Sequence, residues 1–188
     1  GGSIITISCS KSYAQRAILA AALADGRSVL HKYTSCEDNE AAINVAHSLG
    51  AKIEVKGSDI YIEGTGGEKT SLNSINVGES GLVARLSIPL LAHLNDKECI
   101  VEGKKTLLNR PLKDANDIMA AFGSILICEK PLCLPLKIQG DIIPGKAEIT
   151  GKNGSQLISG LLMTLPLTEK SSSIRVIEPK SIPYIFMT

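Results

Sequence analysis

The chain has 188 residues, of which 44% are hydrophobic and 21% are charged, and its formal net charge is +1. This length and composition are typical of a globular domain with a buried core. The near-zero charge and the low aromatic content (four Tyr, two Phe and no Trp) argue against a broad surface for nucleic acid or acidic membranes, so any bound anion must be held by local clusters.

The first predicted helix lies near the start of the chain. Residues 12–24 are rich in Ala and Leu, and Gly26 follows them as a stop signal. Residues 27–33 then predict a strand. A second helix is predicted before Gly50, because four apolar residues recur there with the spacing of one helical face: Ala42, Val45, Ala46 and Leu49. Residues 51–64 predict two short strands.

The same order of elements recurs in the next segment. Residues 81–94 predict a helix, and residues 97–103 predict a strand. Gly123 and a strand pair over 124–140 follow a second helical face, which lies 73 residues after the first: Ala115, Ile118, Met119 and Phe122. A third copy begins with a strand over 146–150, a helix over 155–167 and a strand over 173–178.

These repeats predict one α/β (α+β) domain over residues 1–188. Each unit has the order strand–helix–strand–helix–strand–strand, and the units span about 3–66, 72–140 and 145–188. Pro183 follows Pro111 by 72 residues, and Pro111 is expected to open the second helix of the second unit. We therefore expect the third unit to be incomplete, with a helix and strand pair of roughly thirty residues beyond Thr188.

Each predicted first helix is entered through small and polar residues, in the segments 10–12, 78–81 and 153–156. Helix N-termini have free N–H groups and favour anions, and Gly allows the backbone to approach a ligand closely. Ser and Asn are also preferred N-cap residues. This pattern alone is therefore compatible both with capping and with an anion site.

The basic residues favour the anion site. Lys11 lies at the start of the first helix, and Arg16 lies four residues after Ser12. Arg85 lies four residues after Gly81, and Arg110 directly precedes Pro111 at an expected helix start. Cations at these positions oppose the helix dipole, and a bound phosphate or carboxylate would explain their presence.

Other polar residues give weaker signals. Asp38, Asp114 and Asp117 lie where helix N-terminal carboxylates are common, so capping is their expected role, and no catalytic acid–base pair stands out. The five cysteines contain no CxxC pair and no zinc-like arrangement with His, which indicates reduced thiols, no metal and a cytoplasmic protein. No apolar run reaches the roughly 18 residues of a membrane span.

Five segments resemble one family in sequence and in order. SKSYAQRAILAAALADG (10–26) resembles SKSxxxRxxxxAALAxG, and GESGLVAR (78–85) resembles NAGTxxR. NRPL (109–112), GSQLISGLLM (154–163) and SIPYIFMT (181–188) resemble an RP motif, SSQxxxxLLM and SxPYIxxT. The family is that of the shikimate-pathway enolpyruvyl transferases. The resemblance implies an inside-out α/β barrel domain of three such units, one of two domains in a cytoplasmic enzyme that is a monomer.

The resemblance also implies a reaction without a cofactor or a metal. The enolpyruvyl group of phosphoenolpyruvate passes to the 5-hydroxyl of shikimate 3-phosphate, and phosphate is released. Lys11 and Arg110 would be catalytic side chains, with Lys11 touching both substrates and Arg110 clamping phosphoenolpyruvate beside the Gly81 backbone. Shikimate 3-phosphate would be held by Ser12, Arg16, Ser155, Gln156 and Ser181. Gly154 would also belong to the substrate-binding residues, and Tyr184 would line the site. Gln156 would also lie near phosphoenolpyruvate.

The chain departs from the family pattern at three positions. Glu79 and Leu82 stand where the family usually has Asn and Thr, and Gly154 stands where Ser is preferred. The Glu79 carboxylate would repel phosphoenolpyruvate unless Arg85 or Lys11 pairs with it. Gly154 removes one hydroxyl donor to the phosphate. In the family the proton-transfer groups come from the second domain, so this chain is expected to bind substrate without the catalytic acid and base.

Two alternatives remain. An enzyme similar to UDP-N-acetylglucosamine enolpyruvyl transferase would carry Lys-Asn in the first loop and a reactive Cys in a later loop. This chain has Ser10-Lys11-Ser12 and no Cys in those loops, which disfavours that enzyme. The other alternative is a non-catalytic repeat domain that binds only an anion or a partner.

Overall fold

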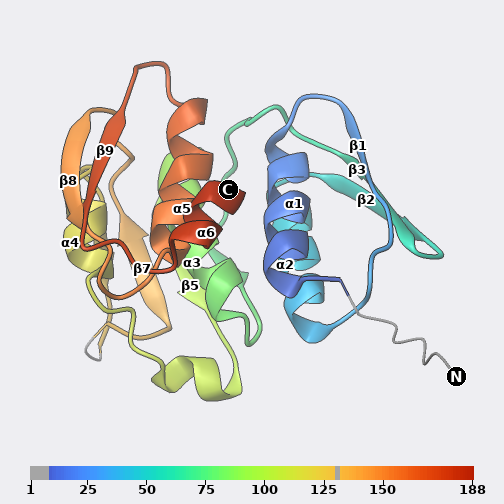
Figure 1. Cartoon of the computed structure of the whole chain (residues 1–188), viewed down its shortest axis with the longest axis horizontal. Coiled ribbons are helices and arrows are strands. Elements are labelled where there is room, and N and C mark those ends of the chain that lie inside the picture. The colour runs from blue at the N-terminus through green and yellow to red at the C-terminus, as the bar shows by residue number, and fades with distance from the viewer. Residues whose placement is uncertain (1–8, 130–131) are drawn as a thin grey trace, which may run out of the picture.

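The computed structural model of the chain describes residues 9–129 and 132–188. Strands lie at the outer sides of the molecule, and the longer helices lie between them (Figure 1). The described helices are α1 (Lys11–Leu23), α2 (Glu37–Ser48), α3 (Gly81–Leu94), α4 (Ala115–Ala120), α5 (Gln156–Thr164) and α6 (Ile182–Met187), with the 3-10 helices η1 (Lys105–Asn109) and η2 (Leu165–Leu167). The chain is therefore a mixed α/β protein.

The three strands of the first sheet correspond in order to three of the four strands of the second. Strands β1 (Arg27–Leu30), β2 (Lys52–Lys56) and β3 (Asp59–Glu63) form an antiparallel sheet of order β1-β3-β2. The second sheet has the order β4-β5-β7-β6, in which β7 pairs antiparallel with β5 and β6 while β4 pairs parallel with β5. Its strands are β4 (Ser74–Asn76), β5 (Cys99–Glu102), β6 (Ile125–Ile127) and β7 (Leu136–Gln139). The order β1-β3-β2 thus corresponds to β5-β7-β6.

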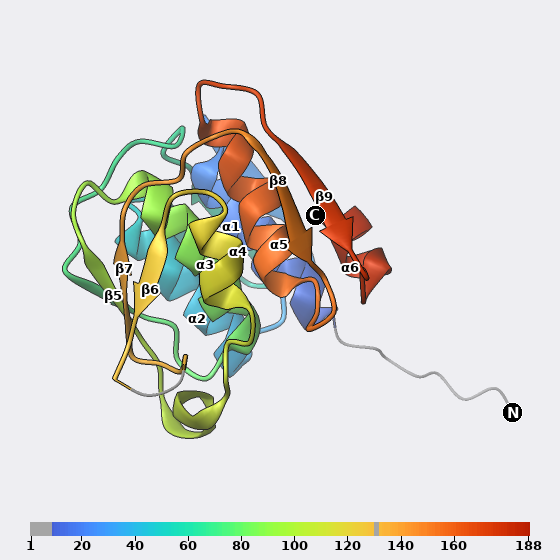
Figure 2. The ribbon, with the colours of Figure 1, turned by 90° about the vertical axis from the view of Figure 1, so that its left-hand side faces the viewer.

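The remaining strands repeat one part of this arrangement. Strands β8 (Lys146–Thr150) and β9 (Ser173–Ile177) pair in parallel, as β4 and β5 do, and they lie beside α5 (Figure 2). The opening strand expected for the first unit, which would be the counterpart of β4, falls mainly in residues 1–8 and lies outside the described residues.

The ends of α2 and α4 confirm the predicted glycine stops. Gly50 and Gly123 have φ angles of 101° and 85°, a left-handed conformation that favours glycine. The residue after each glycine donates its N–H back into the helix, to Ala46 O over 3.0 Å from Ala51 and to Met119 O over 3.1 Å from Ser124. The same C-terminal motif therefore recurs at the 73-residue offset.

One predicted helix start is wrong. Helix α4 begins at Ala115 and not at Pro111, so Arg110 does not lie at the start of an α-helix. Residues Lys105–Asn109 form η1 instead, and Arg110 ends it. The Leu112 N–H bonds to Leu132 O over 2.7 Å, which holds this segment extended until Asp114, with φ of 59°, turns the chain into the helix. Pro183, in contrast, does lie in the first turn of α6, as predicted.

Helix α3 is the central element of the core. Apolar residues occupy nearly its whole circumference, which is typical of a helix buried on all sides. It packs against α5 at Gly160, where a Cβ atom would lie 2.7 Å from the Arg85 carbonyl oxygen and 3.0 Å from Pro89 Cγ. This close approach brings the starts of α3 and α5 together. In the described part of the chain, no helix is both long and apolar enough to cross a membrane.

Candidate functional site: a cationic cleft at three helix N-termini

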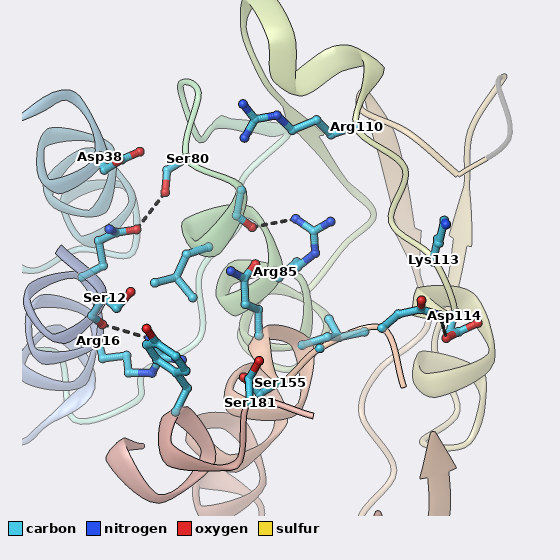
Figure 3. A pocket seen from close by; sticks show the side chains of 18 of the residues that line it. Ser12, Arg16, Asp38, Ser80, Arg85, Arg110, Lys113, Asp114, Ser155 and Ser181 are labelled. Atoms are coloured by element: carbon cyan, nitrogen blue, oxygen red, sulfur yellow. Dashed lines mark hydrogen bonds between the residues drawn. The ribbon is translucent and has the colours of Figure 1, made fainter. Parts of the chain in front are cut away.

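Helices α1, α3 and α5 all begin at one cleft of about 700 Å³. Figure 3 shows polar side chains from these helices, and from the segment after η1, facing this space. All ten site residues predicted from the sequence line it: Lys11, Ser12, Arg16, Gly81, Arg110, Gly154, Ser155, Gln156, Ser181 and Tyr184. Residues as far apart in sequence as Lys11 and Tyr184 are thus brought to one place.

The start of α1 carries an exposed cation and a Ser cap. The Ser10 hydroxyl accepts from the Tyr13 N–H, so the cap predicted from sequence is present. Lys11 Nζ lies 3.4 Å from Asp38 Oδ2, and both side chains are partly exposed to the cleft. Asp38 lies in the first turn of α2, but its carboxylate contacts Lys11 and makes no capping bond, so its predicted capping role is wrong.

Arg16 is a buried cation, with only 5% of the residue exposed. Its Nε donates to Thr188 Oγ1 (2.8 Å), its Nη1 to Ser12 O (2.9 Å) and its Nη2 to Ser159 Oγ (3.1 Å). The Tyr184 ring centroid lies 5.8 Å from its Cζ. Among the described residues no carboxylate pairs with Arg16, and burial lowers the pKa of its guanidinium.

A buried hydrogen bond links the starts of α1 and α3. Ser80 caps α3 by accepting from the Val83 N–H over 3.2 Å, and its hydroxyl donates to Gln15 Oε1 over 2.7 Å. Gln15 Nε2 in turn donates to Lys11 O over 3.0 Å. Gln15 was not identified from the sequence. The signal that could have identified it is a polar residue next to Arg16 in a helix otherwise rich in Ala and Leu.

Arg85 folds back over the start of α3. Its Nη1 donates to Gly81 O over 2.9 Å and its Nη2 donates to Pro111 O over 3.1 Å. A Cβ atom at Gly81 would lie 3.2 Å from Nη1, so glycine gives the guanidinium room there. Burial lowers the pKa of Arg85, and the nearby Arg110 charge lowers it further. Two neighbouring cations make this part of the cleft favourable for an anion.

Two exposed cations, Arg110 and Lys113, line the cleft in the segment between η1 and α4. Arg110 makes one side-chain hydrogen bond, from Nη2 to Thr106 Oγ1 over 3.1 Å. Lys113 is exposed, lines the cleft and has no ion-pair partner among the described residues. Lys113 was not identified from the sequence, because it follows the Arg-Pro motif without any pattern of its own.

Glu79 pairs with a lysine outside the expected site residues. Its Oε2 lies 3.0 Å from Lys105 Nζ, so the cation that offsets its charge is neither Arg85 nor Lys11. Its Oε1 accepts from the Thr106 N–H (3.2 Å) and hydroxyl (3.3 Å). The hydrogen bonds from Lys105 and Thr106 hold the pKa of the Glu79 carboxyl below its usual value.

The start of α5 lines the cleft with a glycine turn and polar residues. Gly154 has φ of 120°, a conformation that strains any other L residue, which accounts for glycine at this departure from the family pattern. Ser155 is buried and its side chain makes no capping bond. The Asn153 amide donates to Asp114 Oδ2. Asp114 is the N-cap residue of α4 but makes no side-chain cap, so its predicted capping role is also wrong.

The charges lining the cleft favour anions. Five cationic and three carboxylate side chains line it. Two of the carboxylates are neutralised locally, Asp38 by Lys11 and Glu79 by Lys105. Four cations therefore line the cleft without an ion-pair partner among the described residues: Arg16, Arg85, Arg110 and Lys113. With three helix N-termini, these groups can bind a ligand, or two ligands, with several anionic groups.

Comparisons with known proteins agree on one family. Residues 2–188 match the family of EPSP synthase (3-phosphoshikimate 1-carboxyvinyltransferase). The chain is 35% identical to the 3-phosphoshikimate 1-carboxyvinyltransferase of Methanobrevibacter smithii, over 95% of this chain and 42% of that protein. It is 33% identical to the enzyme of the same name from Chlamydia abortus, over 98% of this chain and 41% of that protein.

Solved structures are similar in fold. EPSP synthase from Acinetobacter baumannii superposes with a TM-score of 0.80 at 23% identity, over 94% of this chain and 40% of that one. The enolpyruvyl transferase NikO from Streptomyces tendae superposes with a TM-score of 0.62 at 12% identity, over 91% and 39%. The chain spans about 40% of the length of these relatives. The chain therefore belongs to the EPSP synthase (3-phosphoshikimate 1-carboxyvinyltransferase) family.

Proposed function

We propose that this chain is the substrate-binding part of an enzyme that transfers the enolpyruvyl group of phosphoenolpyruvate to the 5-hydroxyl of shikimate 3-phosphate, with release of phosphate. The observation that carries the proposal is the set of four cations around three helix N-termini, none of which has an ion-pair partner in the part of the chain that the structure describes. The two substrates carry phosphate and carboxylate groups, which guanidinium groups and helix N-termini bind well.

Arg16 supports this proposal most directly. Buried charges in proteins are normally paired, because an unpaired charge pays a large desolvation penalty. Three N–H groups of Arg16 donate to neutral oxygens, no carboxylate pairs with it among the described residues, and the residue lines the cleft. A phosphate at the start of α1 supplies the missing negative charge. We assign the 3-phosphate of shikimate 3-phosphate to this position, between Arg16 and the Ser12 and Ser181 hydroxyls.

The remaining residues fit two ligands side by side. We assign the shikimate ring to the wall formed by Gly154, Ser155, Gln156 and Tyr184, and phosphoenolpyruvate to the Gly81 backbone, Arg110 and Lys11. Lys11 then exchanges its contact with Asp38 for contacts with both substrates. Holding the two reactants in reacting geometry is the main contribution that such a site makes to the rate.

The chemistry also needs an acid for the methylene carbon and a base for the hydroxyl proton. Of the three carboxylates that line the cleft, Asp38 and Glu79 each pair with a lysine and Asp114 accepts from the Asn153 amide. We propose that the proton-transfer groups belong to a second domain of a longer cytoplasmic protein that is a monomer. We further propose that the units at about 3–66, 72–140 and 145–188 are repeats of one domain of the inside-out α/β barrel type.

The test is calorimetric titration of shikimate 3-phosphate and then phosphoenolpyruvate into the 188-residue chain. We expect Lys11→Ala and Arg110→Ala to weaken binding about tenfold each, as loss of a charge-assisted contact does. The matched controls Lys97→Ala and Arg27→Ala remove exposed cations that do not line the cleft, and should leave affinity unchanged. Equal affinity in all variants would refute the assignment, and binding of inorganic phosphate alone would favour a non-catalytic anion site.

A further inference from the structure

The segment that carries Arg110 is fixed to the start of α3 through one carboxylate. We propose that Glu79 is a positioning residue for Arg110: it fixes η1 so that the Arg110 guanidinium stays over the cleft. This inference rests on the proposed function for its ligand, phosphoenolpyruvate. It assigns a role to one of the three positions where this chain departs from the family pattern, a position where repulsion of phosphoenolpyruvate is expected unless a cation pairs with the carboxylate.

The contacts form a continuous path. Glu79 Oε1 accepts both the N–H and the hydroxyl of Thr106, at 3.2 and 3.3 Å. The same Thr106 oxygen accepts from Arg110 Nη2 over 3.1 Å, the only side-chain hydrogen bond of Arg110 within residues 9–129 and 132–188. The orientation of the Thr106 hydroxyl is therefore set by Glu79, and it offers its lone pair to Arg110.

The backbone of η1 needs such an anchor. Lys105, the first residue of η1, has φ of 48°, in the left-handed region that is unfavourable for a residue with a side chain. Its ammonium group lies 3.0 Å from Glu79 Oε2, and the neighbouring Lys104 N–H donates to Gly78 O over 2.7 Å. These contacts hold the strained residue against the turn that precedes α3. On the other side of Arg110, the Pro111 carbonyl is held by Arg85.

The direction in which anion affinity changes when the Glu79 carboxylate is removed tests this inference. In an anion cleft, removal of a nearby carboxylate strengthens anion binding if the carboxylate acts by repulsion. If Glu79 acts by holding η1, its removal weakens binding, because Arg110 must then be ordered when the ligand binds. Its charge is already matched by Lys105, which limits the repulsive part.

The experiment measures phosphoenolpyruvate affinity of the 188-residue chain saturated with shikimate 3-phosphate. We expect Glu79→Ala to weaken binding about tenfold and to have no further effect in the Arg110→Ala background, the non-additivity of residues that act as one unit. Glu79→Gln, which keeps an oxygen acceptor for Thr106, should restore part of the affinity. Glu68→Ala, an exposed glutamate away from the cleft, is the control. Unchanged or tighter binding in Glu79→Ala would overturn the proposal.

A second measurement needs no ligand. In ¹⁵N NMR spectra, the Nε–Hε group of Arg110 should show a reduced heteronuclear NOE in Glu79→Ala but not in Glu68→Ala, since an untethered guanidinium moves faster. An unchanged NOE would refute the positioning role even where binding changes. If the unmodified chain binds neither substrate while the NOE responds as expected, the proposed function fails and the positioning of Arg110 by Glu79 stands.

Discussion

Arg16 and Arg110 face the same cleft from opposite walls and are held in opposite ways. Arg16 is buried, and three of its nitrogens donate to fixed oxygens of α1, α5 and the last residue of the chain. Arg110 is exposed, and within the described residues its side chain makes a single hydrogen bond, to a residue of a 3-10 helix. The Arg16 guanidinium is therefore held in place before any ligand binds, whereas the position of the Arg110 guanidinium depends on its one tether.

This difference predicts how much each arginine contributes to ligand binding and to folding stability. A preorganised cation stabilises a bound anion strongly because no ordering is needed when the ligand arrives. In the empty cleft the same cation contributes little to folding, because burial of a charge without an anionic partner offsets its hydrogen bonds. An exposed cation held by one hydrogen bond, such as Arg110, is expected to contribute less to ligand binding than a buried, fixed one. Its contribution to binding depends on how firmly the segment that carries it is held.

The largest expected effect is that of Arg16→Met on ligand binding. Loss of a buried guanidinium from the 3-phosphate position should weaken shikimate 3-phosphate binding at least about 100-fold, or about 2.7 kcal/mol, while the free energy of unfolding changes by about 1 kcal/mol or less. Arg110→Met should change binding about tenfold. Calorimetry and urea denaturation measure the two quantities. If Arg16→Met and Arg110→Met weakened binding equally, the proposed difference between a preorganised Arg16 and a tethered Arg110 would be refuted.

The next largest effect is expected at the contact between α3 and α5, next to Ser159, a partner of Arg16. Gly160→Ala places a methyl group 2.7 Å from the Arg85 carbonyl oxygen, so α5 must move away from α3. Overpacking of this kind typically costs about 2 kcal/mol, which urea denaturation should detect. The shift also moves Ser159, a partner of Arg16, so shikimate 3-phosphate affinity should fall as well. Gly145→Ala, at a site with open space around the Cβ position, is the control.

The smallest expected effect is a pH dependence of the stability that Glu79 contributes through its contacts with η1. The pKa of Glu79 is lowered in the folded chain, first by the hydrogen bond from Lys105. A carboxyl whose pKa is depressed by folding contributes stability above its unfolded value, about 4.3, and loses it as the pH falls through the folded value. The stability difference between the unmodified chain and Glu79→Gln should therefore shrink below about pH 4. A difference that grows as the pH falls would contradict the assignment.

Much of the fold followed from periodic patterns. Helical spacing with glycine stops predicted α2 and α4 and where each ends, and the Ala- and Leu-rich segments predicted α1 and α3 within a few residues of the observed bounds. The start of α4 was missed because the Leu112–Leu132 backbone bond is a long-range contact, which local propensity does not report. Proline at 111 therefore marked a turn and not the first residue of a helix.

The site was predictable to the extent that it lies in motifs. All ten predicted residues line one cleft, but whether they bind as the family pattern implies remains a prediction. Gln15 and Lys113 were missed, and Asp38 and Asp114 were misassigned as caps, because their contacts join residues from different elements. The Glu79–Lys105 pair joins residues 26 positions apart and was likewise outside the reach of a local pattern.

The buried Gln15–Ser80 hydrogen bond has a consequence for motion. It joins the N-cap residue of α3 to α1, and α1 packs against α2 and the β1-β3-β2 sheet. An anion that contacts both helix starts would add further links between α1 and α3. Separation of the two helix starts would then require ligand release, so amide hydrogen exchange in the first turns of α1 and α3 should slow as the fraction of ligand-free chain falls.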